Sequence, residues 1–492
     1  MSRIVFISFL LFNLWTSALS QVQFNIAFEL PSYEYVHGVV QDINGDYIVS
    51  GTSGSLQDQT NAQAFLFRVD SLGGWKWMKY YGTDQVDNGQ NLALMDNGDL
   101  GICGYSDGNR PNDYDIFLIR TNNNGDELWM KFYGGDSWDI ANQVKKTSDD
   151  GFIVAGKTFS FGNGGSDAYL IRTDSDGDTL WTRTFGGPDD DEFHSVVPTM
   201  DGGFVAIGYT ETNTYGMKDA YLVKVDQNGN HLWDKHFGGF RDDIGHSIDE
   251  TAIGDLIWTG EDHSDPGSNG NSDMAVYRLT ADGDSIHSSV QTNYGGGMFD
   301  EIPYVIHPTT DNGYITAGFT QGFWVDMNDF MLMRTNDNCQ FSWAKIYSCI
   351  AFTEEVVGDM IVAADGGFLV ANSTTHGNGP SNIQLVKTDS NADGISVDCV
   401  TGVEDIESGN MVFSYYPNPT QDFLNITLQS TENKGEQGMI RVIDSAGRQV
   451  LSDRSLKQNQ VNSIDLDGLK SGLYYLHISI GGETAGRAFV KN

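Results

Sequence analysis

One position of the chain carries polar side chains at intervals of 52 to 58 residues. Six of its members, the inner ring, are His37, Gln90, Asn142, His194, His246 and Tyr304, and the seventh member is Gly358. Imidazole, amide and phenol groups can both donate and accept hydrogen bonds. Polar variety at a repeated position is what a ligand-reading surface needs. We therefore predict a ligand-binding inner ring, with the alternative that these side chains only line a water-filled channel. A metal site on His194 and His246 lacks an identifiable third ligand.

Acidic side chains form a second candidate site in the turn 174–178. Asp174, Asp176 and Asp178 alternate there around Gly177, and a calcium loop needs several oxygens at regular spacing. An Asp-Gly pair also favours a hairpin turn, because it tolerates left-handed backbone. The equivalent turns at 121–125, 226–229 and 280–283 vary in their acidic residues, which favours the hairpin. Calcium is the only cofactor that the sequence leaves open, as the alternative for this turn.

Two further positions keep one charge sign in all repeats. The acidic column comprises Glu34, Asp87, Asp139, Asp191, Asp243, Glu301 and Glu355, and the basic column comprises Arg68, Arg120, Arg172, Lys224, Arg278, Arg334 and Lys387. A sevenfold pattern usually serves the repeat itself. We expect the carboxylates to accept backbone hydrogen bonds in connecting loops or to pair with the basic column. The functional alternative is a charged ring at one mouth of a channel.

Short strands must position these side chains. In the third repeat the sequence predicts strands at 141–147, 152–157, 168–173 and 179–185, since β-branched and aromatic residues abound and no helical period appears. Four strands per repeat, seven times over, is typical of a seven-bladed β-propeller. A sheet with two apolar faces can bury both only against its neighbours. A β-solenoid or an open array is the alternative. Residues 24–28 and 395–400 both align with a fourth strand, so the closing strand stays open.

Composition narrows the classes of partner. The chain has 492 residues, 39% of them apolar, and a formal net charge of −39. Such a surface repels nucleic acids and anionic membranes and favours cations, or simply keeps the protein soluble. Among four cysteines, Cys103 lies in an apolar strand pattern and is expected to be buried. Whether Cys349 pairs with Cys399 is left open.

The two ends of the chain differ from the repeats. Residues 1–20 combine Arg3, an apolar stretch and a small-residue cleavage site, as in a signal peptide. Residues 21–400 form the repeat body, and the polar segment 401–410 reads as a linker. Residues 411–492 show short alternating strands, which predict a small immunoglobulin-like β-sandwich. No later segment is apolar for long enough to span a membrane, so the mature chain is expected to have no membrane span.

Several ordered motifs of the last segment resemble the type A sorting domain of type IX secretion substrates. They are Tyr416-Pro-Asn-Pro-Thr420, Asp444-Ser-Ala-Gly-Arg448, Leu469-Lys-Ser-Gly-Leu-Tyr474 and Phe489-Val-Lys491. The resemblance implies passage through the inner membrane by the signal peptide and across the outer membrane by this tail. The type IX machinery is then a partner, and the protein is secreted or attached to the outer cell surface. The repeat body also resembles β-propeller repeats that accompany such tails.

These observations favour a non-enzymatic binding or adhesion protein whose propeller is an interaction scaffold for glycans or surface proteins. No serine nucleophile elbow and no His-Glu-x-x-His motif occurs, and near-identical repeats nominate no catalytic residue. A polysaccharide-degrading enzyme built on the propeller is the first alternative, and a passive structural spacer is the second. The identity of the ligand, the cleavage point of the tail and the oligomeric state do not follow from the sequence.

Overall fold

The computed structural model describes most of residues 23–491. The exceptions are 29, 31, 56–57, 111–112, 215–216, 265–270, 292–299, 321–328, 348–352, 377–380, 394–399, 402–405, 409–410, 417–422, 431–436, 445–448, 459–460, 471 and 481–482. The predicted signal peptide, Cys349 and Cys399 therefore lie outside the described residues. The described residues form strands, turns and bends and no helix. Accordingly, none of them forms a helix that could cross a membrane.

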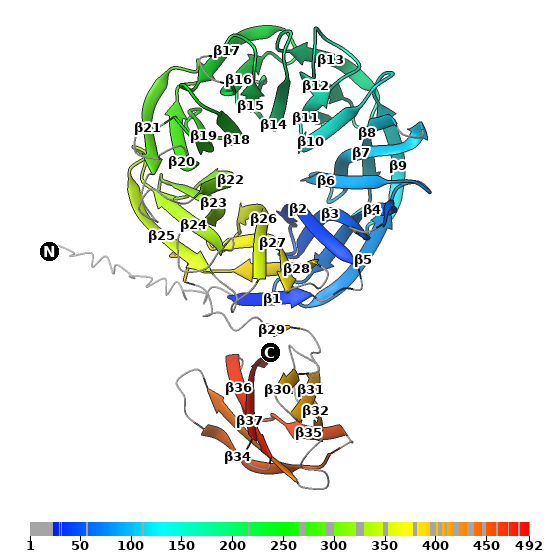
Figure 1. Cartoon of the computed structure of the whole chain (residues 1–492), viewed down its shortest axis with the longest axis vertical. Helices are drawn as coiled ribbons and strands as arrows, with labels where there is room; N and C mark the ends of the chain where they lie inside the picture. Colours follow the sequence, from blue (N-terminus) through cyan, green and yellow to red (C-terminus); the bar gives the residue numbers. More distant parts are fainter. Residues whose placement is uncertain are drawn as a thin grey trace, which may run out of the picture.

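The described strands of the repeat body form seven sheets around one axis (Figure 1). Sheets 1 to 3 contain β2 (Tyr33–Gln41), β3 (Tyr47–Ser55), β4 (Asp58–Val69) and β5 (Trp75–Tyr81); β6 (Asp87–Leu94), β7 (Leu100–Arg110), β8 (Asp113–Thr121) and β9 (Glu127–Tyr133); and β10 (Asp139–Lys146), β11 (Phe152–Thr158), β12 (Asp167–Thr173) and β13 (Thr179–Phe185). Sheets 4 to 6 contain β14 (Asp191–Pro198), β15 (Phe204–Thr210), β16 (Asp219–Val225) and β17 (His231–Phe237); β18 (Asp243–Glu250), β19 (Leu256–Asp262), β20 (Asp273–Leu279) and β21 (Ser285–Gln291); and β22 (Glu301–Pro308), β23 (Tyr314–Thr320), β24 (Asp329–Thr335) and β25 (Phe341–Tyr347). This is an all-β, propeller-like arrangement, as the repeats predicted.

Sheet 7 settles which segment closes the ring. It contains β26 (Thr353–Val362), β27 (Phe368–His376), β28 (Ser381–Lys387), β1 (Phe24–Phe28) and β29 (Val400–Thr401), in that order. The N-terminal strand β1 pairs antiparallel with β28, with Phe24 opposite Lys387. The short strand β29 adds to the outer side of β1 in parallel. β1 thus occupies the fourth position, and of the segment 395–400 only Val400, in β29, lies within the described residues.

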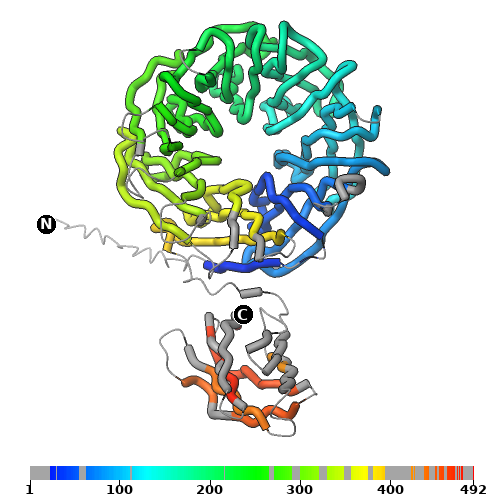
Figure 2. The backbone as a smooth tube through the Cα atoms, in the orientation of Figure 1, coloured from blue at the N-terminus to red at the C-terminus, as the bar shows by residue number. Residues whose placement is uncertain are grey.

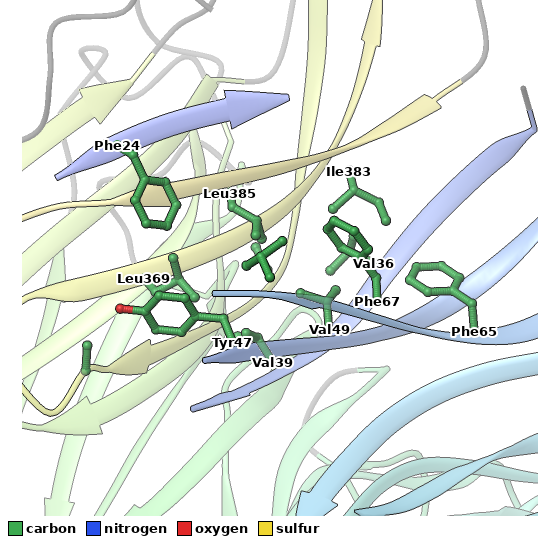
Figure 3. Close-up of a cluster of buried hydrophobic side chains, with 13 residues drawn as sticks. Phe24, Val36, Val39, Tyr47, Val49, Phe65, Phe67, Leu369, Ile383 and Leu385 are labelled. Atoms are coloured by element: carbon green, nitrogen blue, oxygen red, sulfur yellow. The ribbon is translucent and has the colours of Figure 1, made fainter. Parts of the chain in front are cut away.

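The core lies between neighbouring sheets. At the seam between sheets 7 and 1, one buried cluster contains Phe24 of β1, Tyr47 and Phe67 of sheet 1, and Leu369 and Leu385 of sheet 7 (Figure 3). Each side chain in this cluster is almost fully buried. The tube in Figure 2 follows the chain from sheet to sheet around the ring back to this seam. Burial of apolar surface between the sheets is therefore what holds the ring together.

The innermost strand of each sheet has a bulge at the inner-ring position. In β10 the pairing with β11 skips Asn142, and in β14 the pairing with β15 skips His194. The same shift occurs in β2, β18, β22 and β26, and in β6 the pairing with β7 skips Gln90 and Asn91. The repeated glycine of the second strand makes room for it, since a Cβ on Gly156 would lie 1.9 Å from the carbonyl oxygen of Ile140. A bulge bends the strand and re-aims a side chain.

Residues next to the bulges link adjacent sheets. The Gln143 side chain accepts a hydrogen bond from the backbone N–H of Val196 at 2.8 Å. Asp359 accepts one from the Val39 N–H at 3.0 Å, across the seam between sheets 7 and 1. These bonds satisfy backbone donors that the bulges leave without a strand partner.

The segment after the body forms two four-stranded sheets. One contains β30 (Ile406–Ser408), β31 (Met411–Tyr416), β32 (Phe423–Ser430) and β35 (Val461–Asp465), and the other contains β33 (Gly438–Asp444), β34 (Gln449–Leu456), β36 (Gly472–Ile480) and β37 (Glu483–Lys491). Leu424 and Ile464 of the first sheet share one buried cluster with Ile440 and Leu476 of the second. Strand β30 pairs with β31 and lies inside the segment 401–410 that the sequence predicted as linker.

Candidate ligand-binding site at the inner ring

The structure places all six inner-ring residues at bulges of innermost strands, where each is partly exposed. The seventh position is Gly358 because the neighbouring backbone is close: a Cβ there would lie 2.2 Å from the Val36 carbonyl oxygen. The six side chains do not share one environment. His37 and Gln90 line a pocket, whereas His194, His246 and Tyr304 contact one another. Asn142 lies between the two groups.

The pocket lies against sheets 1 to 3 and has a volume of about 390 Å³. Such a volume falls in the ordinary range for small-molecule sites. We call it the aromatic pocket, and its lining residues are Tyr35, His37, Thr52, Gly54, Ala62, Val86, Asn88, Gln90, Tyr105, Tyr114, Trp138 and Ile140. Tyr114 packs edge-on against both Tyr105 and Trp138, with ring centroids 5.4 and 5.3 Å apart. Trp138 is 48% exposed, so part of its ring is available to a ligand.

Among the residues that the structure describes, none that lines the aromatic pocket is a carboxylate, a lysine or an arginine. Burial lowers the pKa of His37 to about 4, so its imidazole is neutral at physiological pH. Burial also raises the pKa of the Tyr105 and Tyr114 hydroxyls, which therefore stay protonated. On a protein with a net charge of −39, the described lining of this pocket thus consists of uncharged aromatic, amide, hydroxyl and small apolar groups.

The other half of the inner ring is a run of stacked rings. His194 and His246 lie nearly parallel, with centroids 5.3 Å apart and an interplanar angle of 11°. Tyr304 packs against His246 at 5.8 Å, and Tyr209 packs against His194 at 5.7 Å. Burial is the main cause that lowers the pKa of His194 to about 4. This side of the ring is therefore aromatic as well, but it includes charged partners.

Two glutamates lie beside these histidines. Glu192 accepts hydrogen bonds from Lys157 and from the Asn142 amide, both at 2.8 Å. Glu261 lies 2.6 Å from Nε2 of His246. We call Lys157, Glu192, His194, His246 and Glu261 the Glu192 cluster. It extends across sheets 3, 4 and 5, and Asn142 joins it to the strand that carries Ile140 of the aromatic pocket.

Four members of the acidic column, Asp87, Asp139, Asp191 and Asp243, accept backbone hydrogen bonds, the first of the two roles predicted for it. Glu34 and Glu301 instead accept from the hydroxyls of Ser53 and Thr320. Asp139 accepts from the Gly135 N–H at 2.8 Å, and Asp191 and Asp243 accept from the equivalent glycines. Burial raises the pKa of Glu34 to about 8, that of Asp243 to about 6 and that of Glu301 to about 7. These six acids are almost fully buried, and the Glu355 side chain lies outside the description.

The basic column pairs with other acids, near the turn between the first and second strands. Arg120 binds Asp99 at 2.8 Å and also donates to the backbone carbonyl of Ser175 in the next sheet at 2.7 Å. Lys387 binds Asp365 at 2.9 Å. The pairs of the other five members are Arg68–Asp42 and Arg68–Asp46, Arg172–Asp149, Lys224–Asp201, Arg278–Asp255 and Arg334–Asp311. These contacts do not join the basic column to the acidic column, which was the second role predicted for the carboxylates.

The turn 174–178 has the contacts of a hairpin. Asp174 accepts hydrogen bonds from the backbone N–H groups of Asp176 and Asp178 at 3.0 and 2.8 Å. Gly177 has a φ of 76°, and Asp178 pairs with Lys131 at 2.6 Å. Across the described residues, no three histidines, cysteines, aspartates or glutamates are grouped so as to hold a metal ion. Cys103 is buried, as the strand pattern predicted.

Sequence reasoning missed the residues beside the inner ring. Tyr105, Lys157, Tyr209 and Glu261 each directly follow the repeated glycine, and Glu192 directly follows the acidic column. Both positions vary between repeats in the same way as the inner ring does. A comparison of these two positions across the repeats could have identified these residues from the sequence. Trp138 and Tyr114 lie outside the shared pattern, so only the structure identifies them.

The C-terminal segment has the two sheets and the common core described above. The Tyr474 hydroxyl donates to the Lys470 carbonyl at 2.8 Å, within one of the quoted motifs. Residues 414–492 match the secretion system C-terminal sorting domain. The sorting domain of type IX substrates indicates export, followed by secretion or attachment to the outer cell surface, and it is recognised by the type IX machinery. No curated protein matches the chain in sequence.

Solved structures with low similarity to the chain include a WD40 domain and a β-propeller domain. The WD40 domain of Neurospora crassa Pan2 matches with a TM-score of 0.45 and 12% identity, over 74% of this chain and 91% of its own. Sqt1 from Chaetomium thermophilum matches with a TM-score of 0.38 and 11% identity, over 74% and 99%. The β-propeller domain of the Trilobed protease from Pyrococcus furiosus gives 0.41 and 7%, over 72% and 93%. The description of the fold rests on the sheets themselves.

Proposed function

We propose that the exported body is a carbohydrate-binding protein and that the aromatic pocket is its binding site. One observation carries the proposal: the described lining of the pocket holds no charged side chain, on a strongly acidic protein. A cationic ligand would be matched by carboxylates, and an anionic ligand by lysine or arginine. A neutral ligand with many hydroxyl groups is matched by amides, phenols and a neutral imidazole.

The aromatic side chains strengthen this choice among neutral ligands. Sugar rings have apolar faces of C–H groups and polar edges of hydroxyls. Trp138 and Tyr114 can cover such a face, while Asn88 and Gln90 can bond the hydroxyl groups. A protein partner would fit this site less well, because protein interfaces are wide and a pocket of about 390 Å³ is concave and small.

We also propose that the body is a seven-bladed β-propeller and the sorting domain an immunoglobulin-like β-sandwich. Supporting observations are the seven sheets of the described body residues and the shared core of the two C-terminal sheets. In this arrangement β1 and β28 close the last blade. Crystallography of the exported protein tests both assignments.

A glycan array followed by calorimetric titration tests the binding function. Wild-type body should bind neutral saccharides, and Trp138→Ala and Tyr114→Ala should each weaken binding by about tenfold or more. Phe240→Ala is the matched control, since this phenylalanine is 91% exposed and lies outside the pocket. Equal affinity of Trp138→Ala and wild type would refute the site.

The same saccharides should be assayed for hydrolysis, because binding alone distinguishes an adhesion protein from a degrading enzyme. Bound sugar without new reducing ends supports the binding function. Release of reducing ends that a single carboxylate substitution abolishes would replace it with the enzyme alternative. Neither binding nor hydrolysis of any saccharide would favour the passive spacer.

A further inference from the structure

The protonation of His194 is fixed by its neighbours. Its Nδ1 lies 2.9 Å from the backbone carbonyl oxygen of Gly245. A carbonyl only accepts hydrogen bonds, so Nδ1 must carry the proton. With the pKa of His194 lowered to about 4 by burial, the ring is neutral, and its Nε2 presents a lone pair.

That lone pair faces another acceptor. Nε2 of His194 lies 3.9 Å from Oε1 of Glu192, a separation too long for a direct hydrogen bond. The two side chains are 23% and 11% exposed, so they form a sheltered gap with an acceptor on each side. Hydrogen-bonded side chains hold the gap open, because Glu192 is bound by Lys157 and Asn142. A ligand that brings two donor hydrogens, for example on two neighbouring hydroxyl groups, can bond both acceptors at once.

The gap and the aromatic pocket are neighbours on one strand. Ile140 lines the pocket, and Asn142 of the same strand β10 donates to Glu192. Two residues of strand cover about 7 Å. A ligand longer than a single sugar ring can therefore reach from the pocket to the gap.

We propose that Glu192 and His194 form a second saccharide subsite, which accepts hydrogen bonds from two neighbouring sugar hydroxyls. The ligand is then a neutral oligosaccharide that extends from the aromatic pocket across β10 to sheet 4. This inference rests on the proposed carbohydrate-binding function and adds the length of the ligand. Tyr209, whose ring packs against His194, provides an aromatic wall at the second subsite.

Chain length provides the binding test. Gluco- and manno-oligosaccharides of one to six units are titrated into wild type, Glu192→Gln and Trp138→Ala. Wild type should gain about tenfold in affinity between the disaccharide and the tetrasaccharide, and Glu192→Gln should lose most of that gain while it keeps disaccharide binding. Trp138→Ala should weaken all lengths. Glu250→Gln is the control and should behave as wild type. Glu250 is the last residue of β18 and accepts a hydrogen bond from the Met200 N–H.

The outcomes separate the two proposals. Disaccharide binding without any gain in the longer sugars overturns the second subsite and leaves the aromatic pocket intact. A full gain in Glu192→Gln has the same meaning. Absence of binding for every sugar overturns both proposals.

A spectroscopic measurement decides the point independently of how the variants fold. Nitrogen-15 NMR of wild type near pH 7 should show His194 protonated at Nδ1, and the tetrasaccharide should shift its Nε2 signal. His194 protonated at Nε2, or an Nε2 signal that the bound tetrasaccharide leaves unmoved, would overturn the subsite.

Discussion

Nδ1 of His307 lies 2.7 Å from Oδ2 of Asp249, and its Nε2 lies 2.9 Å from the carbonyl oxygen of Met360. Both neighbours are acceptors, so both ring nitrogens must donate and the imidazole must be charged. His307 thereby links three consecutive innermost strands, β18, β22 and β26. Burial lowers the pKa of His307, but the hydrogen bond and the negative charge of Asp249 raise it above its usual value. The charge of Lys145 lowers this pKa, and that of Asp359 raises it.

The His307 contact predicts a pH dependence. A histidine whose pKa is raised by folding contributes stability below its unfolded pKa, and this contribution is lost as the pH rises through the folded pKa. Asp249→Asn should lower the pKa of His307 and flatten this part of the stability profile. NMR titration of the ring together with urea unfolding between pH 5 and 8 measures both. A His307 pKa below that of a free histidine would contradict the prediction.

The buried Glu34 predicts that one substitution stabilises the protein at alkaline pH. Its pKa of about 8 results from burial, with the Ser53 hydroxyl opposing, so the folded state holds a proton that the unfolded state releases. Stability should therefore fall between about pH 4.5 and pH 8. Glu34→Gln should remove this fall and be more stable than wild type at pH 8 by on the order of 1–3 kcal/mol. Glu127→Gln, at an exposed position, is the control in urea unfolding at pH 5 and pH 8.

Lys387 predicts an asymmetry between two substitutions. Its side chain is fully buried and bound to Asp365. Asp365→Ala leaves the ammonium group without its charged partner and should cost about 3–5 kcal/mol, whereas Lys387→Met removes the charge and should cost about 1 kcal/mol or less. Thermal and urea unfolding give the two values. Similar losses in both variants would show that the pair, and not the isolated charge, matters.

Ring closure predicts a large effect of one residue near the N-terminus. Phe24 is buried in the seam between sheets 7 and 1. Phe24→Ala should lower the free energy of unfolding by roughly 3–5 kcal/mol. Ile43→Ala, at a side chain that is 96% exposed, should change it by no more than about 0.5 kcal/mol. Equal stability of the two variants would mean that β1 does not close the ring.

Much of the fold could be predicted because the same local strand pattern recurs in seven repeats. The strand predicted at 179–185 matches β13, and the one at 152–157 falls one residue short of β11. The predicted start at Ala141 missed the first two residues of β10, Asp139 and Ile140, because the start depends on the buried carboxylate of Asp139 and not on an apolar pattern.

The site was harder to predict than the fold. The inner-ring column was identified from its polar variety, but the bulge that sets its side chains apart was not. The repeated glycine was its sequence signal, since Gly156 and its equivalents have no room for a Cβ against the bulged strand. The aromatic pocket depends on Trp138 and Tyr114, which come from segments outside the shared pattern, and their proximity is a result of packing between sheets.

The pairing of β1 with β28 has a consequence for biogenesis. Sheet 7 stays incomplete until the start and the end of the body are both present in one compartment. The ring therefore cannot close before the chain has been made as far as β28. A product truncated before Ser381 would retain an N-terminal strand without its partner.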